Sequence, residues 1–354
     1  MELSLVIPTY NEKENIQKLI KKIQEEFKKN KIKGEIIVVD DNSPDGTGKI
    51  LEDLKKTKNL KIIHRKGKLG LSSAVLEGWK IANGEILGAM DADLSHPSEK
   101  ISEMLNLIKN EKTDFVVGSR YVKGGKIIGW NFKRKLLSKT ATLLARVYTQ
   151  VKDPMTGFFM IKKECIKNVE LNPKGFKILL ELIIKANYKR LKEVPITFTN
   201  RIKGKSKVGT KEIVCYLQNL IGYLSYKKNV IKEFFKFAFI GGIGTLFNIV
   251  ILYLLTEKVG IYYMFSAVIS FIIAMTSNFI LNKIWTFKEN IKLNVGKKYV
   301  QFGLVSISAL LVNLFFLYIF TEVLGIYYII SQILAIGMAL IINFFGNKIW
   351  TFSK

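Results

Sequence analysis

The stretch Ile86-Leu87-Gly88-Ala89-Met90-Asp91-Ala92-Asp93 decides the fold class of the first part of this chain. It is a short apolar run that ends in two carboxylates, which is typical of a buried strand whose carboxyl end opens on a binding site. Residues two apart in an extended segment point the same way, so Asp91 and Asp93 are predicted to face one site. For an isolated Asp-x-Asp, a solvated turn is the competing interpretation.

The same organisation continues on both sides of this stretch. Apolar runs at 3–7, 35–39, 61–63, 85–90 and 114–117 alternate with helical patterns at 14–29, 47–56, 72–82 and 97–109. This alternation predicts an α/β domain with a mostly parallel, doubly wound sheet and ligands outside the carboxyl ends of its strands. Acids also follow the first two strands, as Glu12 and as Asp40-Asp41. That context favours a binding site over a solvated turn.

Carboxylates and a metal, rather than a glycine-rich cradle, are expected to hold any nucleotide here. Mg²⁺ and Mn²⁺ prefer oxygen ligands and take several of them from phosphates and water. The segment Asp45-Gly46-Thr47-Gly48-Lys49 is not a P-loop, because Ser43 stands where the first glycine is required. No Gly-x-Gly-x-x-Gly follows the first strand, which excludes the common dinucleotide fingerprint.

The last third of the chain repeats itself with a shift of 65 residues. Gly260-Ile261-Tyr262-Tyr263 returns at 325–328, and Asn282-Lys283-Ile284-Trp285-Thr286-Phe287 returns at 347–352. Each copy holds two uncharged stretches of about 20 residues, enough to cross a hydrocarbon core. We predict spans at 237–256, 259–282, 299–321 and 323–347, arranged as a parallel repeat. The expected domains are residues 1–210, a juxtamembrane helical linker at 211–233, and a transmembrane domain at 234–354.

The charge of the chain is strongly positive and unevenly distributed. Residues 234–354 carry nine lysines and three glutamates, or +6, which leaves +20 of the total +26 on residues 1–233. Such a surface suits anionic lipids or anionic small molecules. Nucleic acid is disfavoured, since no helix-turn-helix, zinc or RNA-recognition signature accompanies the charge. Cys165 and Cys215 are interpreted as reduced packing residues.

Lysine placement predicts how the chain sits in a membrane. The loops expected before span one and between spans two and three are rich in lysine, whereas the other two loops hold Lys258 or no base. The positive-inside rule then places both termini and the first domain in the cytoplasm, at the cell membrane. We expect no signal peptide, because Met1-Glu2 runs directly into a strand.

At this point the motifs resemble a known family. Residues 1 to about 210 are similar to the polyprenyl-phosphate glycosyltransferases of family 2, above all to archaeal dolichyl-phosphate mannose synthases, and 234–354 resemble a GtrA-like membrane domain. The motifs that carry the resemblance are Ile7-Pro8-Thr9-Tyr10-Asn11-Glu12, Val38-Val39-Asp40-Asp41-Asn42-Ser43-Pro44-Asp45, Gly70-Leu71-Ser72-Ser73-Ala74, Met90-Asp91-Ala92-Asp93-Leu94-Ser95-His96-Pro97, Gly118-Ser119-Arg120-Tyr121, Asp153-Pro154-Met155-Thr156-Gly157-Phe158-Phe159, Gly175-Phe176-Lys177-Ile178, Arg201 and Gly204-Lys205-Ser206-Lys207.

The resemblance implies a Rossmann-like GT-A domain with a nucleotide sugar and a divalent metal, Mg²⁺ or Mn²⁺. Asp91, Asp93 and Ser95 are the implied metal site, although these synthases often carry Gln where Ser95 stands, so the shorter hydroxyl is expected to reach the ion only through water. His96 is interpreted as structural. The implied nucleotide-sugar residues are Pro8, Tyr10, Glu12, Val39, Asp41, Asp91, Ala92, Asp93, Ser95, Arg120, Lys177, Arg201 and Lys207.

The basic residues downstream fit an anionic acceptor. A polyprenyl phosphate is already charged near pH 7 and needs no general base, but it is repelled by the donor diphosphate, a repulsion that arginines can offset. Asp153 is therefore expected to orient the arginines. Lys177, Arg201 and Lys207 resemble a loop that closes over both substrates; solvated surface charge is the competing interpretation. The implied catalytic residues are Asp93, Arg120 and Arg134, and the implied acceptor-phosphate residues are Arg120, Arg134 and Ser138.

The predicted activity is inverting transfer of a sugar to dolichyl or polyprenyl phosphate. Mannose from GDP-mannose is the first choice and glucose from UDP-glucose the second. A lipid-sugar flippase or scaffold with an inactive first domain is the rival class. The segments 136–151 and 212–226 are predicted either to lie in the membrane interface as amphipathic helices or to pack against the globular core. Oligomerisation through the membrane domain is left open.

Overall fold

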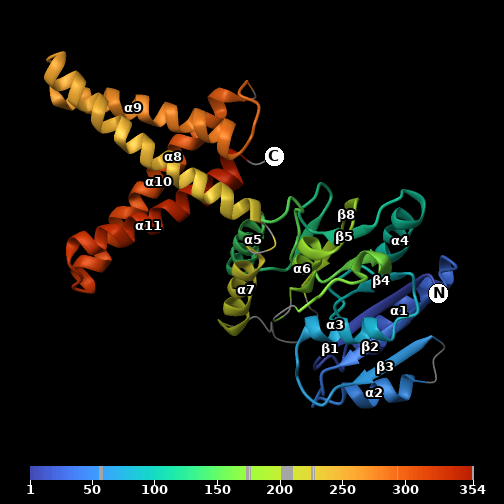
Figure 1. The fold of residues 1–354 in the computed structure, drawn as a ribbon. Helices are drawn as coiled ribbons and strands as arrows, with labels where there is room; N and C mark the ends of the chain where they lie inside the picture. The colour runs from blue at the N-terminus through green and yellow to red at the C-terminus, as the bar shows by residue number, and fades with distance from the viewer. Residues whose placement is uncertain are drawn as a thin grey trace. The chain divides into compact units, whose positions relative to one another are not determined.

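The computed structural model describes residues 1–55, 59–172, 175, 177–200, 210–224, 226, 228–292 and 294–352. The chain divides into two compact units, Met1–Tyr226 and Lys227–Lys354 (Figure 1). The boundary between them falls inside the 211–233 segment that the sequence predicts as a linker. The helix α7 (Thr210–Tyr223) packs within the first unit, and the helix α8 (Lys228–Tyr253) begins the second.

The first unit is built on a seven-stranded, mostly parallel sheet, which confirms the predicted α/β class. The strand order is β3-β2-β1-β4-β7-β5-β8. One strand is antiparallel, because β7 runs opposite to both of its neighbours, β4 and β5. The strands are β1 (Leu3–Thr9), β2 (Gly34–Asp40), β3 (Leu60–His64), β4 (Ile86–Ala89), β5 (Phe115–Ser119), β7 (Phe159–Lys162) and β8 (Leu191–Pro195).

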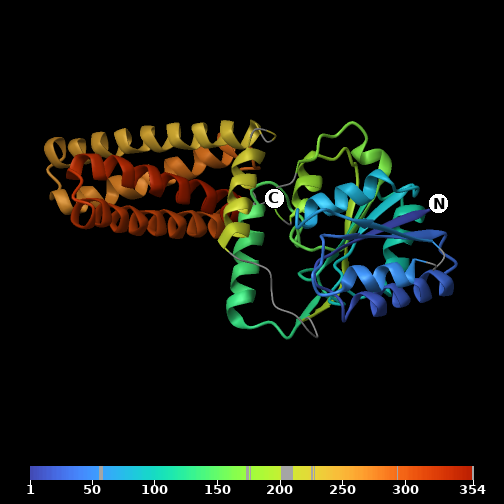
Figure 2. The ribbon, with the colours of Figure 1, turned by 90° about the horizontal axis from the view of Figure 1, so that it is seen from below.

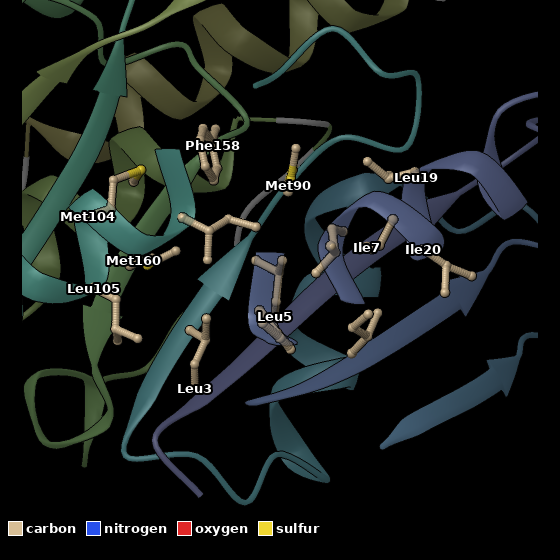
Figure 3. Packing of buried hydrophobic residues seen from close by; sticks show 14 of the residues in the cluster. Leu3, Leu5, Ile7, Leu19, Ile20, Met90, Met104, Leu105, Phe158 and Met160 are labelled. Atoms are coloured by element: carbon tan, nitrogen blue, oxygen red, sulfur yellow. The ribbon is translucent and has the colours of Figure 1, made fainter. Parts of the chain in front are cut away.

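Helices cover both faces of this sheet. Successive strand residues point to opposite faces, so Leu3, Leu5 and Ile7 pack against one set of helices (Figure 3), while Val6 packs against the other. Strands buried on both faces explain why β1 and β2 read as continuous apolar runs. The first face carries α1 (Ile16–Lys29), α2 (Thr47–Leu54) and α4 (Lys100–Asn110), and the second carries α3 (Leu71–Lys80) and α6 (Ile178–Lys185).

The carboxyl ends of β1, β2 and β4 meet at one edge of the sheet. All three strands are parallel neighbours, with Thr9 paired to Asp40 and Val6 paired to Ala89. The polar residues that follow each strand are therefore neighbours, although they lie as many as 80 residues apart in sequence. This edge is where the candidate site is found.

A second, two-stranded sheet was not predicted from the sequence. Its strands β6 (Lys126–Ile128) and β9 (Thr197–Thr199) are parallel and lie about 70 residues apart in the chain. The helix α5 (Phe132–Ala145) follows β6 closely. The short connection means that β6 determines where α5 begins.

The helices α5 and α7 are joined to each other by tyrosines. Tyr216 donates a hydrogen bond to the carbonyl of Ala141 at 2.7 Å, and Tyr148 donates one to the carbonyl of Leu220. Burial raises the pKa of Tyr148 to about 12. The opposite side of α5 leaves Phe132 77 % exposed and Leu136 54 % exposed. One face of this pair thus packs against the unit, and an apolar face is left uncovered.

The second unit holds four helices that are long and apolar enough to cross a membrane (Figure 2). They form two hairpins, and Figure 1 shows that these spread apart away from a shared end. Two spans start later than predicted, at Tyr263 and Tyr328, because Gly260 and Gly325 adopt positive φ and interrupt the chain just before them. The candidate spans are Asn229–Lys258, Tyr263–Thr286, Val295–Val323 and Tyr328–Thr351.

Each span ends in a five-residue π-helical turn. The helices are α8, α9 (Tyr263–Leu281), α10 (Val295–Tyr318) and α11 (Tyr328–Gly346). The turns are Leu254–Lys258, Asn282–Thr286, Ile319–Val323 and Asn347–Thr351. Both copies of the sequence repeat thus share the same irregularity at the same place.

The repeat is also a symmetry of the core. Phe287 stacks on its counterpart Phe352, with 4.4 Å between ring centroids. A shift of 65 residues converts the contact of Phe237 with Phe344 into that of Phe302 with Phe279. Both contacts have 5.7 Å between ring centroids. The six buried rings that make these contacts are Phe237, Phe279, Phe287, Phe302, Phe344 and Phe352.

Ion pairs in the second unit break this symmetry. Lys348 pairs with Glu233, but the shift of 65 replaces Glu233 by Lys298 in the other copy. There, Glu289 lies between Lys298, at 2.6 Å, and the fully buried Lys283, at 3.3 Å. A buried ammonium without a counter-charge is costly. This copy has Lys298 where the other has Glu233, and Glu289 supplies the carboxylate instead.

The aromatic core should stabilise both copies equally. Phe287→Ala and Phe352→Ala each remove a fully packed ring, and each should lower the free energy of unfolding by about 3–5 kcal/mol. The measurement is thermal denaturation in detergent micelles, with Phe271→Ala, which alters a half-exposed ring, as the control. A loss at only one of the two positions would show that the sequence repeat is not an energetic symmetry.

Candidate functional site

A cavity of about 420 Å³ lies at the carboxyl edge of the seven-stranded sheet. Its volume is in the range of small-molecule sites. Most of the site residues predicted from the sequence line it, and they come from elements that are distant in the chain. These are Pro8, Tyr10, Glu12, Asp41, Asp91, Ala92, Asp93, Arg120, Arg134, Ser138 and Lys177.

Of the remaining predicted residues, Arg201 and Lys207 lie outside the described residues, and Val39 and Ser95 are not among those that line the cavity. The side chain of Val39 is fully buried in the core between the sheet and α3, because its position in β2 points it away from the strand end. Ser95 is also buried, and its side chain does not reach the cavity wall. Contact of Val39 with the nucleotide sugar stays a prediction.

Asp91 is held in place from two sides. Its Oδ2 lies 3.1 Å from Nε2 of His96, whose ring is buried between Phe158 and Phe198. On the other side, a Cβ added to Gly157 would lie 2.3 Å from Oδ1 of Asp91. Glycine is therefore required at 157 for the carboxylate to occupy this position. His96, predicted to be structural, contacts a cavity residue directly.

Asp93 precedes a turn in which Leu94 adopts a backbone conformation that is unfavourable for residues other than glycine. Leu94 has φ +61°, a left-handed conformation that is strained for leucine. The turn brings the backbone N–H of Ser95 back to Oδ1 of Asp93 at 3.1 Å. Such backbone strain beside a cavity indicates that the orientation of the Asp93 carboxylate is functionally important.

The acidic wall fits a hard divalent cation. Asp91 and Asp93 both line the cavity and offer only carboxylate oxygens, the ligands that Mg²⁺ and Mn²⁺ prefer. Ser95 Oγ is buried and has no hydrogen-bond partner among the described residues, so this hydroxyl can still accept or donate a hydrogen bond. Because Ser95 does not line the cavity, the donor set suits an ion held by two carboxylates, with any help from Ser95 arriving through water.

Another group of possible ligands lies elsewhere and does not resemble a metal site. Asp114, Glu164 and Cys165 come within 4.8 Å of one another at the amino end of β5. Lys162 already pairs with both carboxylates, at 3.0 Å from Asp114 and 3.7 Å from Glu164. Burial raises the pKa of Cys165 to about 11, so its thiol stays protonated.

Asp41 is oriented by a network that the sequence did not reveal. Arg65 donates to Oδ1 of Asp41 at 2.5 Å, and the backbone N–H of Gly70 donates to Oδ2 at 2.8 Å. Arg65 also lies 2.9 Å from Glu77 and donates to Ser73. The available signal was that Arg65 directly follows β3, which places it at the same edge of the sheet.

The first loop supplies an aromatic face and a second acid. The ammonium of Lys68 lies 4.4 Å from the ring centroid of Tyr10, a cation–π distance. Glu12 is buried, and its Oε2 accepts a hydrogen bond from Asn15 at 2.9 Å. Pro8, Tyr10 and Asp41 thus form one end of the cavity, with a ring and a carboxylate available to a planar base.

Arg120, Arg134 and Lys177 also line the cavity and are called its basic wall, and Arg120 is the most buried of them. Asp153 accepts bonds from Nε and Nη2 of Arg120, both at 2.7 Å, and from the backbone N–H of Arg120 at 2.9 Å. Burial disfavours the charged form, but the hydrogen bonds and charge of Asp153 outweigh it and raise the pKa of Arg120. Asp153 therefore fixes an arginine, as predicted for it, and is itself fully buried.

Arg134 and Ser138 reach the same wall from α5. Arg134 donates to the side-chain carbonyl of Asn200 at 2.7 Å, and Ser138 accepts a bond from Tyr121 at 2.8 Å. The N-terminus of α5 is set by Asn131, whose side chain accepts from the backbone N–H of Arg134. One helical turn separates Arg134 from Ser138, so both point to one side.

Lys177 completes the basic wall with an unusually acidic ammonium group. Its Nζ donates to the carbonyl of Met155 at 2.9 Å. Burial, together with the positive charge of Arg120, lowers its pKa from the usual range to about 8. Asp91 and Asp153 oppose that shift. An anion entering the cavity would favour the protonated form of Lys177.

The comparisons with known proteins divide the chain in the same way. The description "Glycosyl transferase family 2" matches residues 4–169, and "GtrA/DPMS, transmembrane domain" matches residues 236–352. With the four apolar helices, the second match identifies a multi-pass membrane protein. The aspartates of the acidic wall and Arg120 lie within the first match.

One curated relative matches nearly the whole chain, and another matches somewhat less than two thirds of it. A dolichol-phosphate mannosyltransferase of Pyrococcus furiosus is 38 % identical over 355 residues, which cover 98 % of each chain. One of Saccharomyces cerevisiae is 39 % identical over 234 residues, covering 62 % of this chain and 86 % of that protein. Among solved structures, mannosyl-3-phosphoglycerate synthase from Rubrobacter xylanophilus has a TM-score of 0.50 at 15 % identity, covering 64 % of this chain and 75 % of that one. This last likeness shows a shared fold alone.

Displacing the Asp91 carboxylate should weaken metal binding without unfolding the protein. In Gly157→Ala the new methyl group overlaps Oδ1 of Asp91, a mobile side-chain end that can rotate away. The affinity for Mn²⁺ in the presence of GDP, measured by calorimetry, should fall about tenfold or more. Gly67→Ala, where no atom lies within 4 Å of the added Cβ, is the matched control. Equal affinities in the two variants would contradict this role of Asp91.

The pKa of Lys177 predicts a distinctive pH dependence. A neutral amine reacts and an ammonium does not, so acylation of Lys177 should rise with pH through a half-point near its pKa of about 8. Acylation of the exposed Lys133, followed in the same samples, is the reference. Peptide mass spectrometry after a brief pulse of reagent measures both, and bound GDP should raise the Lys177 half-point. A half-point equal to that of Lys133 would contradict the assignment.

Proposed function

The chain belongs to the dolichol-phosphate mannosyltransferases, and we propose that it transfers mannose from GDP-mannose to dolichyl phosphate with inversion at the anomeric carbon. One observation supports this above the others. A single cavity is lined both by carboxylates, those of Asp91 and Asp93, and by guanidinium groups, those of Arg120 and Arg134. The carboxylates suit a metal-bound diphosphate, and the guanidinium groups suit a phosphate acceptor.

The donor is proposed to lie along the sheet edge. Tyr10 and Asp41 face the base and ribose, and Asp91 and Asp93 lie toward the diphosphate. Mg²⁺ or Mn²⁺ bound there would neutralise charge on the leaving diphosphate. Lys177 places a further positive charge beside it, because an amine with a pKa of about 8 is mostly protonated near pH 7.

The acceptor is proposed to be held by Arg120, Arg134 and Ser138. A phosphate oxygen attacks the anomeric carbon, the new C–O bond forms, and the bond from that carbon to the GDP oxygen breaks, so that GDP leaves. No proton has to be removed, because the phosphate is already anionic near neutral pH. Asp153 is committed to Arg120 through two 2.7 Å bonds, which makes it an orienting residue rather than a base.

An apolar wall continues from the phosphate subsite. Leu137, Ala141 and Leu144 of α5 and Leu217 of α7 line the cavity beside Arg134. The exposed apolar face of α5 lies on the same helix. We assign this wall to the prenyl chain, which requires the catalytic unit to work at a membrane surface. The lysine distribution supports a cytoplasmic orientation at the cell membrane.

The decisive experiment follows radiolabelled mannose from GDP-mannose into a dolichyl phosphate fraction. Asp93→Ala removes a carboxylate of the donor wall and should lower the rate at least about a hundredfold. Asp53→Ala, an exposed carboxylate on α2, is the matched control and should behave as wild type.

Two results would count against the proposal. Full activity in Asp93→Ala would contradict the assignment of Asp93 to the donor site. Transfer from UDP-glucose in preference to GDP-mannose would contradict the assignment of GDP-mannose as the donor. Proton NMR of the anomeric position in the product tests inversion independently of rate.

A further inference from the structure

We infer that Trp130 is a positioning residue whose indole ring holds Arg120 and Arg134 together on the acceptor wall of the cavity. The inference rests on the proposed function, because it assigns the two arginines to the acceptor phosphate. Trp130 itself lines the cavity. Nothing in the sequence pattern singled it out, since a lone tryptophan in a polar stretch reads as ordinary surface packing.

The small sheet determines where Trp130 lies. The strands β6 and β9 are parallel, with Ile128 paired to Thr199, so the residues that follow them emerge at the same edge. Gly129 makes this close approach possible, because it adopts φ +81° and an added Cβ would lie 2.8 Å from Cβ of Asn200. Trp130 and Asn200 are thereby delivered side by side, next to the start of α5 and its Arg134.

The ring of Trp130 is shared by two cations. The guanidinium carbon of Arg134 lies 4.3 Å from the ring centroid, and that of Arg120 lies 5.2 Å from it. Both distances are within the cation–π range. Phe198 of β9 supports the indole edge-on, with 5.4 Å between centroids, and also faces Arg120. One aromatic platform therefore sets the positions of both arginines.

This arrangement solves an electrostatic problem of the acceptor wall. Two like charges held close together repel, and the penalty is larger in a cavity than in water. Asp153 offsets the charge of Arg120. Asn200 and the Trp130 ring, by contrast, hold Arg134 without contributing any formal negative charge. The platform therefore orders Arg134 through the face of the indole ring and through Asn200.

The test measures the affinity for farnesyl phosphate, a short polyprenyl phosphate, by calorimetry on the full chain in detergent. Trp130→Leu removes the aromatic face and should weaken binding about tenfold, whereas Trp130→Phe keeps a smaller ring and should weaken it about threefold. Affinity for GDP should not change in either variant. Trp79→Phe, which alters a buried tryptophan in the core of the same unit, controls for packing and should leave both affinities unchanged.

A double-mutant cycle separates positioning from mere structural support. If Trp130 acts by ordering Arg134, then Trp130→Leu should cost much less in an Arg134→Gln background than in the wild type. Equal farnesyl phosphate affinity in wild type and Trp130→Leu, or a full tenfold loss that persists in the Arg134→Gln background, overturns the inference. Wild-type protein that binds farnesyl phosphate in this Trp130-dependent way but transfers no mannose would instead overturn the proposed function alone.

Discussion

The pairing of Arg120 with Asp153 is the interaction on which the whole site depends. Burying a guanidinium without a partner costs desolvation free energy. The Asp153 carboxylate offsets this cost by accepting two side-chain hydrogen bonds and one backbone hydrogen bond from Arg120. With Arg120 fixed, Trp130 has a stable neighbour, and Arg134 can be placed beside it. The cavity then combines positive charge with the Asp91 and Asp93 carboxylates. That positive charge offsets the repulsion between an anionic acceptor and an anionic donor that the proposed function entails.

Much of this organisation could be predicted from the sequence, for a clear physical reason. Parallel strands bring their carboxyl ends to one edge, so acids after β1, β2 and β4 had to become neighbours. The residues that could not be predicted depend on long-range pairing. The strand β7 enters the sheet antiparallel, β6 pairs with β9 across about 70 residues, and neither pairing has a local signal. Trp130 became visible as a neighbour of the two arginines only once the pairing of β6 with β9 was known.

The membrane unit shows the complementary case, in which sequence repetition revealed a structural symmetry. The 65-residue shift predicted two equivalent halves, and the stack of Phe287 on Phe352 lies between them. The prediction of where spans begin was less accurate, because a run of apolar residues does not show where Gly260 and Gly325 interrupt the helices. The ion pairs do not follow this symmetry. Lys348 pairs with Glu233 in one copy, whereas the other copy has Lys298 at the matching position and uses Glu289 as the carboxylate.

The central claim is that one cavity brings a metal-bound donor and a phosphate acceptor together. Paramagnetic relaxation tests it most directly, because Mn²⁺ strongly broadens phosphorus signals only at short range. In the presence of GDP, the ³¹P signal of bound farnesyl phosphate should broaden strongly with Mn²⁺ and not with Mg²⁺, and Asp93→Ala should abolish the effect. A bound acceptor whose ³¹P signal is the same with either metal would place the phosphate away from the aspartates and contradict the account.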